Sequence, residues 1–523
     1  MNIRAFLNLL VVALAATAPR LAAQALPQTT AERTNYAATS TNADVGAFLD
    51  SLGLAGAPVA VSEMSSSALG KPIYFVIASD PTVTSPGAAA ESGKLVVYLQ
   101  ANIHGGEVEG KEAVLALLRE LAGPRRDLLQ RLVVLVAPDY NPDGNDAFGP
   151  QAVNRSEQNG PAVVGQRPDG KNLDLNRDYF KAEAPETRAS LARVYTTWDP
   201  ALMVDLHTTD GTLHGYQLTY APPLDPNGPA GPTAYVRDRM LPTLRQTLQD
   251  KYREPIFDYG NVETQQTPQS WDTYAPLGWY GTNYLGLRGR MAILSEAYSH
   301  ADFKTRVQVT HDFLVEILDY AARHGDEIRR LEREADRQTA LEGAGTGTRP
   351  SLAVAYKLAS RGVEPVRLEV TQQVRTYPLP VKDRFVDSLT RPLPAGYFLP
   401  AADSDVAALL RLHGIQVQRL AREWTDTVEV LTGTELKPAT REFQGHHLLE
   451  VTGTWARAPR RVPAGGYFVS TAQPLGRLVF ALLEPEGFGL ARWGAFSAGS
   501  TSGLEFPVWR AGRAPRAPSR VLP

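Results

Sequence analysis

The sequence predicts an α/β fold, with a mixed, largely parallel sheet flanked by helices and followed by a smaller β-rich domain. Three observations predict it. Between about residues 94 and 318, short runs rich in β-branched residues alternate with helical stretches. A charged helix and a Gly-rich linker then end this pattern, and beyond residue 350 the chain continues in short strand-like runs separated by prolines. At 523 residues, the chain is long enough for more than one domain.

The composition is that of a globular protein with balanced charge. Hydrophobic residues make up 43% and charged residues 21%, which excludes wholesale disorder, collagen-like repeats and a coiled-coil rod. The 53 basic and 56 acidic side chains are too balanced for nucleic acid or an anionic membrane to be the expected partner. Because the chain has no cysteine, it has no disulfide and no thiolate metal site, and any metal must be held by His, Asp or Glu.

Residues 1–25 have the features of a secretory signal peptide. A basic start at Arg4 precedes an apolar stretch, and Ala23 and Ala25 occupy the −3 and −1 positions of a cleavage site. The apolar stretch is shorter than the roughly 20 residues needed to span a bilayer. We therefore expect a secreted or periplasmic protein that is not stably inserted in a membrane.

Four apolar runs define the strands expected in the main domain. They cover residues 94–103, 131–140, 201–207 and 291–298. Amphipathic helical stretches lie between them, such as residues 109–123, which end at a glycine. This domain is predicted over 26–330, and a charged helix with a linker follows over 331–349.

The remaining sequence is predicted to form an accessory β-rich domain over 350–508. Its expected strands cover residues 367–374, 427–433, 447–453 and 477–485. Residues 509–523 are rich in Arg and Pro and are expected to be a disordered tail. The adjacent His446 and His447 would point apart in a strand, so no metal site is assigned to them.

Histidines and glutamates stand where the predicted strands end. His104 and Glu107 follow the first run across a Gly-Gly turn, while His207 ends the third run and Glu296 lies near the end of the fourth. An HxxE spacing alone is a weak signal, but the carboxyl ends of such strands border one shared crevice. Two His and one Glu with an open fourth position form a catalytic zinc site, and a spare carboxylate suits a general base. The sequence thus predicts one Zn²⁺ per chain.

Several short motifs occur in the order and rough spacing of a known family. They are HGGE at 104–107, NPDG at 141–144, NRD at 176–178 and DLH at 205–207, followed by Glu296. Over about residues 30–330 the chain therefore resembles the zinc metallocarboxypeptidases related to carboxypeptidases A and T. The resemblance implies these roles: zinc ligands His104, Glu107 and His207; a clamp for the free α-carboxylate of a peptide, Asn176 and Arg177; and Glu296, which activates the attacking water.

The residue chemistry supports the clamp, but two family roles have several candidates. A guanidinium forms bidentate pairs with carboxylates, which fits Arg177. For the arginine that the family uses to stabilise the oxyanion, Arg155 fits the spacing better than Arg167. For the family's substrate-capping tyrosine, Tyr284 has the more loop-like context, and Tyr274 and Tyr280 remain alternatives.

The predicted reaction is metal-assisted hydrolysis of the C-terminal peptide bond of peptides or proteins. The pocket floor is expected around 272–284, where Asp272 is the single acidic residue, so an apolar or aromatic terminal residue is favoured. One alternative is a murein stem-peptide amidase or peptidase, or a deacylase, that uses the same zinc site. Another is a non-catalytic protein that binds C-terminal carboxylates, although such a protein has no need of the base Glu296.

Overall fold

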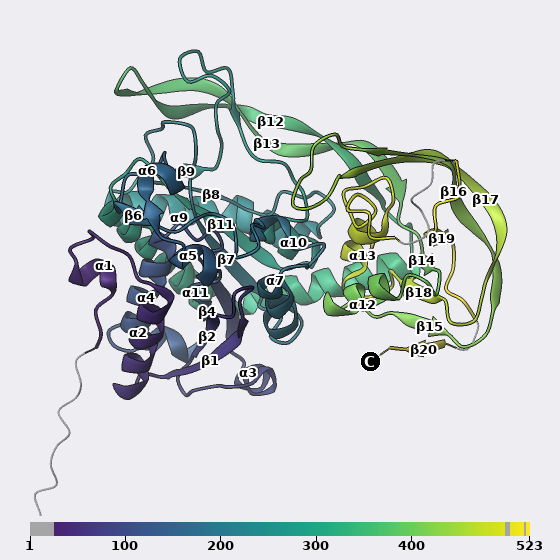
Figure 1. Ribbon diagram of the computed structural model, residues 1–523, viewed down its shortest axis with the longest axis horizontal. Coiled ribbons are helices and arrows are strands. Elements are labelled where there is room, and N and C mark those ends of the chain that lie inside the picture. Colours follow the sequence, from purple (N-terminus) through teal and green to yellow (C-terminus); the bar gives the residue numbers. More distant parts are fainter. Residues whose placement is uncertain (1–25, 497–502, 517–518, 523) are drawn as a thin grey trace, which may run out of the picture.

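The computed structural model describes residues 26–496, 503–516 and 519–522. These residues form an α/β half, on the left of Figure 1, and a β-rich half on its right, joined by one long helix and one long hairpin. The predicted signal peptide, residues 1–25, lies outside the described residues. Among the described residues, no helix is both long enough and apolar enough to cross a membrane.

An eight-stranded sheet forms the centre of the α/β half, in the order β1-β2-β4-β3-β7-β11-β8-β9. The four predicted runs are its middle strands and lie parallel to one another. The neighbouring strands β1 and β2, β2 and β4, and β8 and β11 pair in antiparallel orientation, which confirms the predicted mixed, largely parallel sheet. The strands are β1 Val59–Ser66, β2 Pro72–Ala78, β3 Leu95–Ala101, β4 Leu132–Ala137, β7 Leu202–Thr208, β8 Leu218–Ala221, β9 Ile256–Asp258 and β11 Met291–Ala297.

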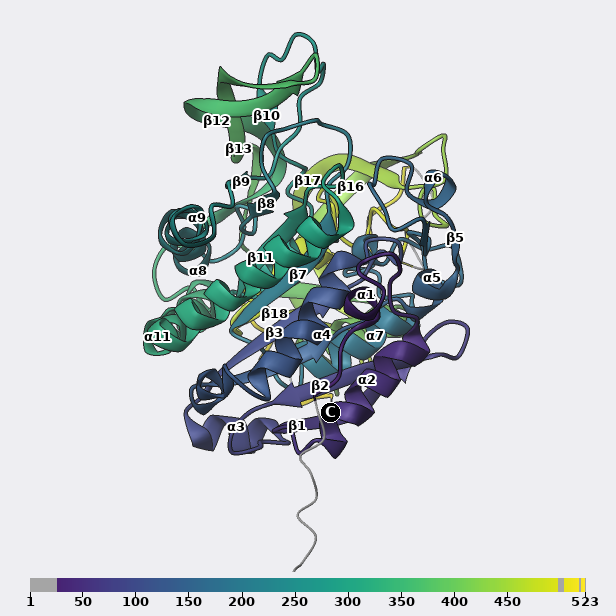
Figure 2. The same cartoon turned by 90° about the vertical axis from the view of Figure 1, so that its left-hand side faces the viewer.

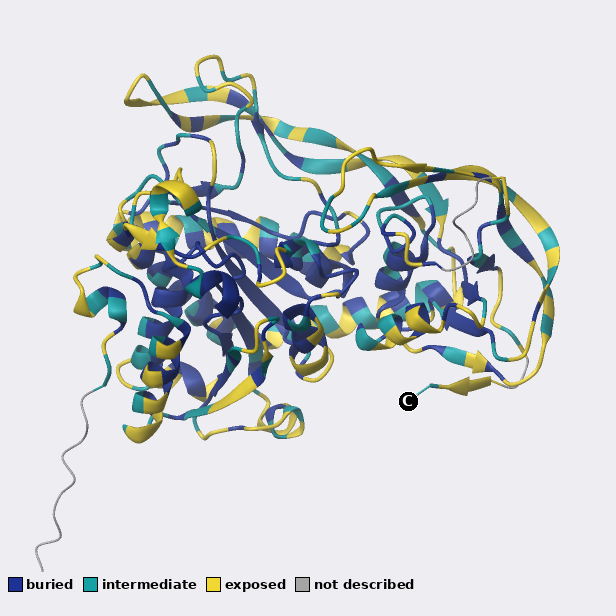
Figure 3. Ribbon diagram, in the orientation of Figure 1, coloured by how far each residue is buried: buried dark blue, intermediate teal, exposed yellow. Residues whose placement is uncertain are grey.

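Helices cover both faces of this sheet. One face carries α2 (Asn42–Leu54), α4 (Glu109–Leu121) and α11 (Phe303–Ala344), which lie in front of the sheet in Figure 2. The other face packs against α7 (Pro185–Ser190) and α10 (Gly281–Leu287). Because side chains alternate along a strand, the central strands carry apolar residues toward both layers, and Figure 3 shows them almost wholly buried.

Shorter elements connect these layers. Helices α8, η4, α9 and η5 follow one another without a break over residues 230–252. The remaining elements of this half are α1 Thr30–Arg33, α3 Pro86–Ser92, η1 Arg126–Gln130, α5 Pro142–Asp146, β5 Gly149–Pro150, α6 Gln151–Asn154, β6 Val163–Val164, η2 Leu175–Arg177, η3 Leu191–Tyr195, α8 Ala230–Tyr235, η4 Val236–Met240, α9 Leu241–Thr247, η5 Leu248–Tyr252 and β10 Trp271–Asp272.

A long hairpin leads from the first half into the second. Its strands β12 (Ser351–Val370) and β13 (Gln373–Pro392) pair along their length, and β13 also pairs with the short strand β10. In Figure 1 the hairpin extends back above the α/β half, where Leu368 forms a bridge with His214. It follows α11, which runs unbroken through the predicted boundary at residue 330.

The C-terminal half is built on a seven-stranded antiparallel sheet in the order β17-β16-β19-β14-β18-β15-β20. This confirms the β-rich prediction. Its elements are β14 Gly396–Leu399, α12 Ser404–Leu412, β15 Gln418–Leu420, β16 Trp424–Pro438, β17 Leu449–Val462, β18 Tyr467–Ser470, α13 Gly476–Leu483, β19 Trp509–Ala511 and β20 Ser519–Val521.

Two expectations for this half need correction. The run 477–485 was expected to be a strand but lies mostly in α13, because Leu478, Val479, Leu482 and Leu483 form one buried helical stripe. The segment expected to be a disordered tail from residue 509 contributes β19 to the interior of the sheet. Arg510 lies there with 3% exposure and pairs with the buried Glu484, a contact that a local sequence pattern does not reveal.

The two halves share a hydrophobic core. One cluster of buried side chains contains Trp198 and Tyr284 from the first half together with Leu410 and Phe480 from the second. Arg288 links them further, since its guanidinium donates to the carbonyl oxygen of His413 at 2.7 Å. The C-terminal half is therefore packed directly against the α/β half.

Candidate active site

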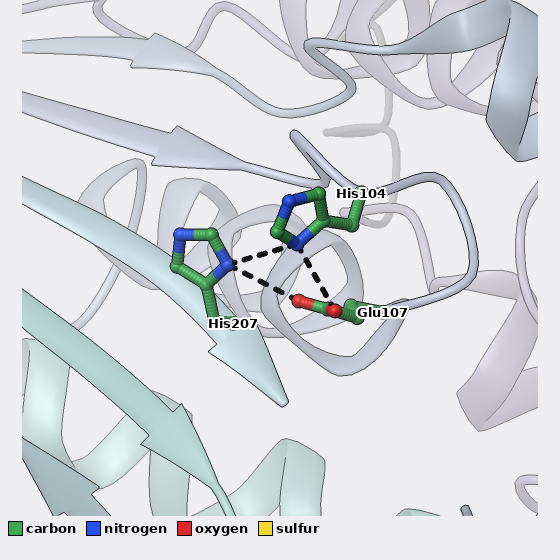
Figure 4. Close-up of side chains that lie close together, drawn as sticks. All are labelled: His104, Glu107 and His207. Carbon is green, nitrogen blue, oxygen red and sulfur yellow. Dashed lines mark hydrogen bonds and ion pairs between the residues drawn. The ribbon is translucent and has the colours of Figure 1, made fainter. Parts of the chain in front are cut away.

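Three side chains converge at the carboxyl ends of β3 and β7, as Figure 4 shows. Nδ1 of His104 lies 3.0 Å from one carboxylate oxygen of Glu107, and Nδ1 of His207 lies 3.1 Å from the other. The two Nδ1 atoms are 3.2 Å apart. All three side chains are almost fully buried. The structure thus brings together the three residues predicted as metal ligands.

Two packed turns give the backbone the shape that this convergence needs. A Cβ atom at Gly105 would lie 2.1 Å from the carbonyl carbon of Gly144, so only glycine fits between His104 and the NPDG turn. Asn141 holds that second turn, because its side chain accepts from the Gly144 N–H at 2.9 Å and donates to the Ile103 carbonyl at 3.2 Å. The HGGE and NPDG motifs are therefore one packed unit.

The donor set fits a zinc ion. Zinc ligands at about 2.0–2.1 Å in a tetrahedron are separated by about 3.3 Å, close to the spacings among these three side chains. Two imidazole nitrogens and one carboxylate facing a common point are also the ligand types of catalytic zinc sites that keep one position open. His104, Glu107 and His207 could therefore hold the ion together.

Each histidine contacts a second carboxylate through its other ring nitrogen. Nε2 of His104 lies 3.0 Å from Oδ1 of Asp174, and Nε2 of His207 lies 3.1 Å from Oδ2 of Asp205. Such contacts orient a ligating imidazole and raise its basicity. Neither aspartate was predicted, although Asp205 stands two residues before His207 and so faces the same side of the strand.

Burial and neighbouring charges shift the acidity of the two glutamates in opposite directions. Burial raises the pKa of Glu107, but His104 and Arg155 outweigh it and hold this pKa well below its usual range. Burial raises the pKa of Glu296 to about 8, with a further contribution from the Glu107 charge and an opposing one from His207. A carboxyl group that titrates near neutral pH suits proton transfer.

The metal ligands and Glu296 border one open cavity of about 550 Å³. The predicted clamp residues Asn176 and Arg177 border it as well. Residues that the sequence did not single out complete its wall: Thr208, Asp210, Tyr259, Thr282 and Leu294. Asp272, the acid expected on the floor, does not line this cavity and instead lies 3.2 Å from Nζ of Lys382 in the hairpin.

The clamp residues are held by contacts on both sides. Oδ1 of Asn176 accepts from the backbone N–H of Gly281 at 2.9 Å. The Arg177 guanidinium donates to the Asn176 carbonyl at 2.9 Å and lies 4.5 Å from the centre of the Tyr280 ring. The structure thus places an arginine with spare N–H donors on the cavity that holds the three candidate ligands.

Both candidate arginines approach Glu107, but they occupy different positions. Arg167 lines the cavity; its Nη1 lies 3.3 Å from Glu107, and its Nε donates to Asp174 at 3.0 Å. Arg155 lies 3.0 Å from the same Glu107 oxygen but is not among the lining residues. Its side chain packs against Gly106. Of the two arginines, Arg167 is the one that borders the cavity.

The tyrosine chosen from the sequence lies elsewhere. The Tyr284 side chain is fully buried in the shared core, where its hydroxyl is 2.9 Å from Nδ1 of His413. Helix α10 turns Tyr284 away from the cavity, so the substrate contact predicted for it does not fit its position. The alternatives Tyr274 and Tyr280 both line the cavity.

Comparison with known proteins identifies similar sequences. Residues 47–275 match a family model described as zinc carboxypeptidase, which confirms the resemblance found in the motifs. The matched range contains the three candidate ligands and the clamp and ends before Tyr280 and Glu296.

Full-length relatives and a solved structure are similar to the chain more distantly. Carboxypeptidase 2 of Trichophyton tonsurans is 24% identical over 479 residues, covering 84% of this chain and 80% of the relative. The probable carboxypeptidase 2 of Arthroderma benhamiae is 25% identical over 446 residues, covering 79% and 77%. A metallo-carboxypeptidase from Pseudomonas aeruginosa, solved in complex with (2-guanidinoethylmercapto)succinic acid, is 18% identical with a TM-score of 0.38, covering 54% of this chain and 68% of that one.

Proposed function

We propose that this protein removes single residues from the free C-termini of peptides. The premise is that residues 47–275 form a domain of the zinc carboxypeptidase family and that the protein is a metallocarboxypeptidase. Glu296 is the general base in this proposal. The catalytic unit is proposed to be residues 26–330, joined through α11 to an accessory unit that begins at residue 350 and includes β19 and β20.

One observation carries the proposal: Arg177 and Asn176 border the same cavity as the three candidate ligands and Glu296. A guanidinium recognises a carboxylate through two parallel hydrogen bonds, and an Asn side chain can add a third. A peptide whose terminal carboxylate binds there would present its last peptide bond to Glu296 and the ligand set. This arrangement favours an exopeptidase over an enzyme that cuts within chains.

His104, Glu107 and His207 would hold the zinc ion in this proposal. When bound, zinc supplies Lewis acidity that polarises a carbonyl group and lowers the pKa of water. Asp174 and Asp205 keep the two imidazole rings oriented toward the ion.

The chain's own groups account for the proton transfers. A carboxylate oxygen of Glu296 takes one proton from the attacking water as the new C–O bond forms. Arg167, on the cavity wall, stabilises the negative charge that develops on the carbonyl oxygen. Glu296 then returns the proton to the leaving nitrogen as the C–N bond breaks. The products are a shortened peptide with a new carboxylate and one free amino acid.

Export is part of the proposal. The basic start, apolar stretch and Ala-x-Ala exit of residues 1–25 support removal by a signal peptidase and a secreted or periplasmic location. Sequencing the N-terminus of the protein recovered from outside the cytoplasm tests this, and the expected first residue is Leu26.

Mass spectrometry of paired peptides tests the function. The zinc-loaded protein is incubated with peptides that differ only in a free or an amidated C-terminus, and with murein stem peptides as a separate arm. We expect loss of single terminal residues from the free peptides. The Glu296→Gln variant should lower kcat by about 10²–10⁴-fold while retaining zinc. Cleavage confined to murein fragments would replace this function with a cell-wall peptidase.

A further inference from the structure

A loop of the C-terminal half reaches the metal-binding region. It covers residues 439–448 and connects β16 to β17. Near its tip, Oε1 of Gln444 accepts a hydrogen bond of 2.7 Å from the backbone N–H of Asp174, 270 positions earlier in the chain. We propose that Gln444 is a positioning residue, which holds Asp174 so that the substrate-carboxylate clamp keeps its geometry. This inference rests on the proposed carboxypeptidase function.

The loop tip is built to present this side chain. Phe443 and His446 pair through two backbone hydrogen bonds, of 2.8 Å and 3.1 Å. The two residues between them, Gln444 and Gly445, have φ values of 53° and 77°. Positive φ at both central positions is typical of the tight type I′ hairpin turn. Gln444 is therefore held in a defined direction rather than carried on a loose loop.

Asp174 is the point at which several active-site groups meet. Its Oδ1 accepts from the backbone N–H of Asn176 at 2.9 Å and lies 3.0 Å from Nε2 of His104. Its Oδ2 accepts from Nε of Arg167 at 3.0 Å and lies 3.8 Å from Nη1 of Arg177. A shift of the Asp174 backbone would therefore move both arginines of the cavity relative to the metal ligands.

The same loop supports the clamp from its other side. The Tyr280 ring lies under the Arg177 guanidinium and contacts the Trp279 ring at a centroid distance of 6.3 Å. Trp279 in turn packs against Phe443 at 6.1 Å and against Trp493 at 5.2 Å, both from the C-terminal half. The clamp thus has a hydrogen-bonded support at Asp174 and an aromatic support at Tyr280, and both lead to the C-terminal half.

A side-chain contact between His446 and Glu183 anchors the loop beside these contacts. Nε2 of His446 lies 2.8 Å from one carboxylate oxygen of Glu183, and Nζ of Lys181 lies 2.8 Å from the other. The loop is therefore attached to the catalytic half on both sides of Gln444. On these contacts, the C-terminal half completes the substrate site instead of acting as a separate binding module.

Substitutions at Gln444 test the proposal. Gln444→Met keeps the length of the side chain but removes the acceptor, while Gln444→Glu keeps an acceptor oxygen. Glu442→Ala, at an exposed position of the same loop, is the matched control. Two quantities are measured: the ratio of kcat/KM for free and amidated peptides, and the Kd of both peptides for zinc-loaded protein that also carries Glu296→Gln. Zinc content and Tm are recorded for every variant.

We expect Gln444→Met to weaken binding of the free peptide by about 2- to 10-fold, the effect of one hydrogen bond, and to lower the free-to-amidated ratio similarly. Binding of the amidated peptide, zinc content and Tm should stay unchanged. Gln444→Glu and Glu442→Ala should behave like the unsubstituted protein.

An unchanged Kd and ratio in Gln444→Met would overturn the proposal. Equal losses for both peptides, with a lower Tm or less zinc, would assign Gln444 a purely structural role and also reject it. If the unsubstituted protein releases no terminal residue, the carboxypeptidase function fails separately. The binding measurement still decides the role of Gln444, because it needs no turnover.

Discussion

Asp205 and His207 stand two residues apart on β7, and Oδ2 of Asp205 lies 3.1 Å from Nε2 of His207. Alternation along the strand puts both side chains on the same face. Gln100 donates to the other Asp205 oxygen at 3.0 Å and so holds the carboxylate in place. Burial lowers the pKa of His207, but the Asp205 charge outweighs it and raises this pKa well above its usual range. The carboxylate thereby directs the opposite nitrogen, Nδ1, toward His104 and Glu107.

Replacing Asp205 should weaken zinc binding without unfolding the protein. Asp205→Asn keeps the side-chain volume but removes the charge that orients His207, and losses of about 10- to 100-fold in metal affinity are typical of such changes. Competition with a chromogenic chelator measures the affinity. Asp272→Asn, outside the cavity, is the control and should bind zinc like the unsubstituted protein. Equal affinity in Asp205→Asn would show that the contact does not tune the site.

The two arginines near Glu107 should respond differently to substitution. Arg167→Gln removes a donor from the cavity wall and should lower kcat by about 10²–10³-fold, as expected for a group that stabilises an oxyanion. Arg155→Gln leaves the cavity wall intact and should act mainly on zinc affinity, since Arg155 contacts the candidate ligand Glu107 without lining the cavity. Steady-state kinetics at saturating zinc separate the effect on kcat from the effect on zinc affinity. A larger loss of kcat in Arg155→Gln would restore the assignment made from motif spacing.

Tyr280 and Tyr284 form a second contrasting pair. Tyr280→Ala removes the ring beneath the Arg177 guanidinium and should raise KM for free peptides several-fold, with Tm unchanged. Tyr284→Phe removes the hydroxyl that contacts His413 in the core and should lower the free energy of unfolding by about 1 kcal/mol, with KM unchanged. Peptide kinetics and urea unfolding of both variants check this. A raised KM in Tyr284→Phe would contradict the placement of that side chain.

Stability should depend on pH through His311, which joins α11 to α4. Its Nε2 lies 3.2 Å from Glu120 and its Nδ1 lies 3.1 Å from Asp312. Burial lowers the pKa of His311, but the two carboxylates outweigh it and raise this pKa to about 9. Because the folded-state pKa lies above the unfolded value of about 6.5, this stabilisation is complete below pH 6.5 and disappears as the pH rises through 9.

The His311→Gln variant tests this dependence. At pH 6 it should be less stable than the unsubstituted protein by about 3 kcal/mol, and the difference should vanish by about pH 10. Urea unfolding at several pH values measures it. His324→Gln, at a more exposed position of the same helix, serves as the control. A difference that stays constant with pH would indicate lost packing rather than lost charge.

Local sequence predicted the parts of the fold and site that depend on neighbouring residues. The four β-branched runs became β3, β4, β7 and β11, and their ends carry His104, His207 and Glu296. Run 477–485 was mistaken for a strand because a short apolar segment suits either a buried strand or a buried helix. The strand at 509–511 was missed because its partners lie far away in the chain: it pairs with β14 and β16, and Arg510 contacts Glu484.

The sequence by itself determined which residues could form the metal site, because strand runs and tight Gly turns are local properties of the chain. It also placed Asn176 directly before Arg177, the pair proposed as the carboxylate clamp. Only the tertiary structure decided that Arg167 and Tyr280 face the cavity while Arg155 and Tyr284 do not. Only the tertiary structure, likewise, joined Gln444 to Asp174. The physical reason is that such contacts arise from packing between segments far apart in the chain, and no periodicity or spacing within one segment encodes them.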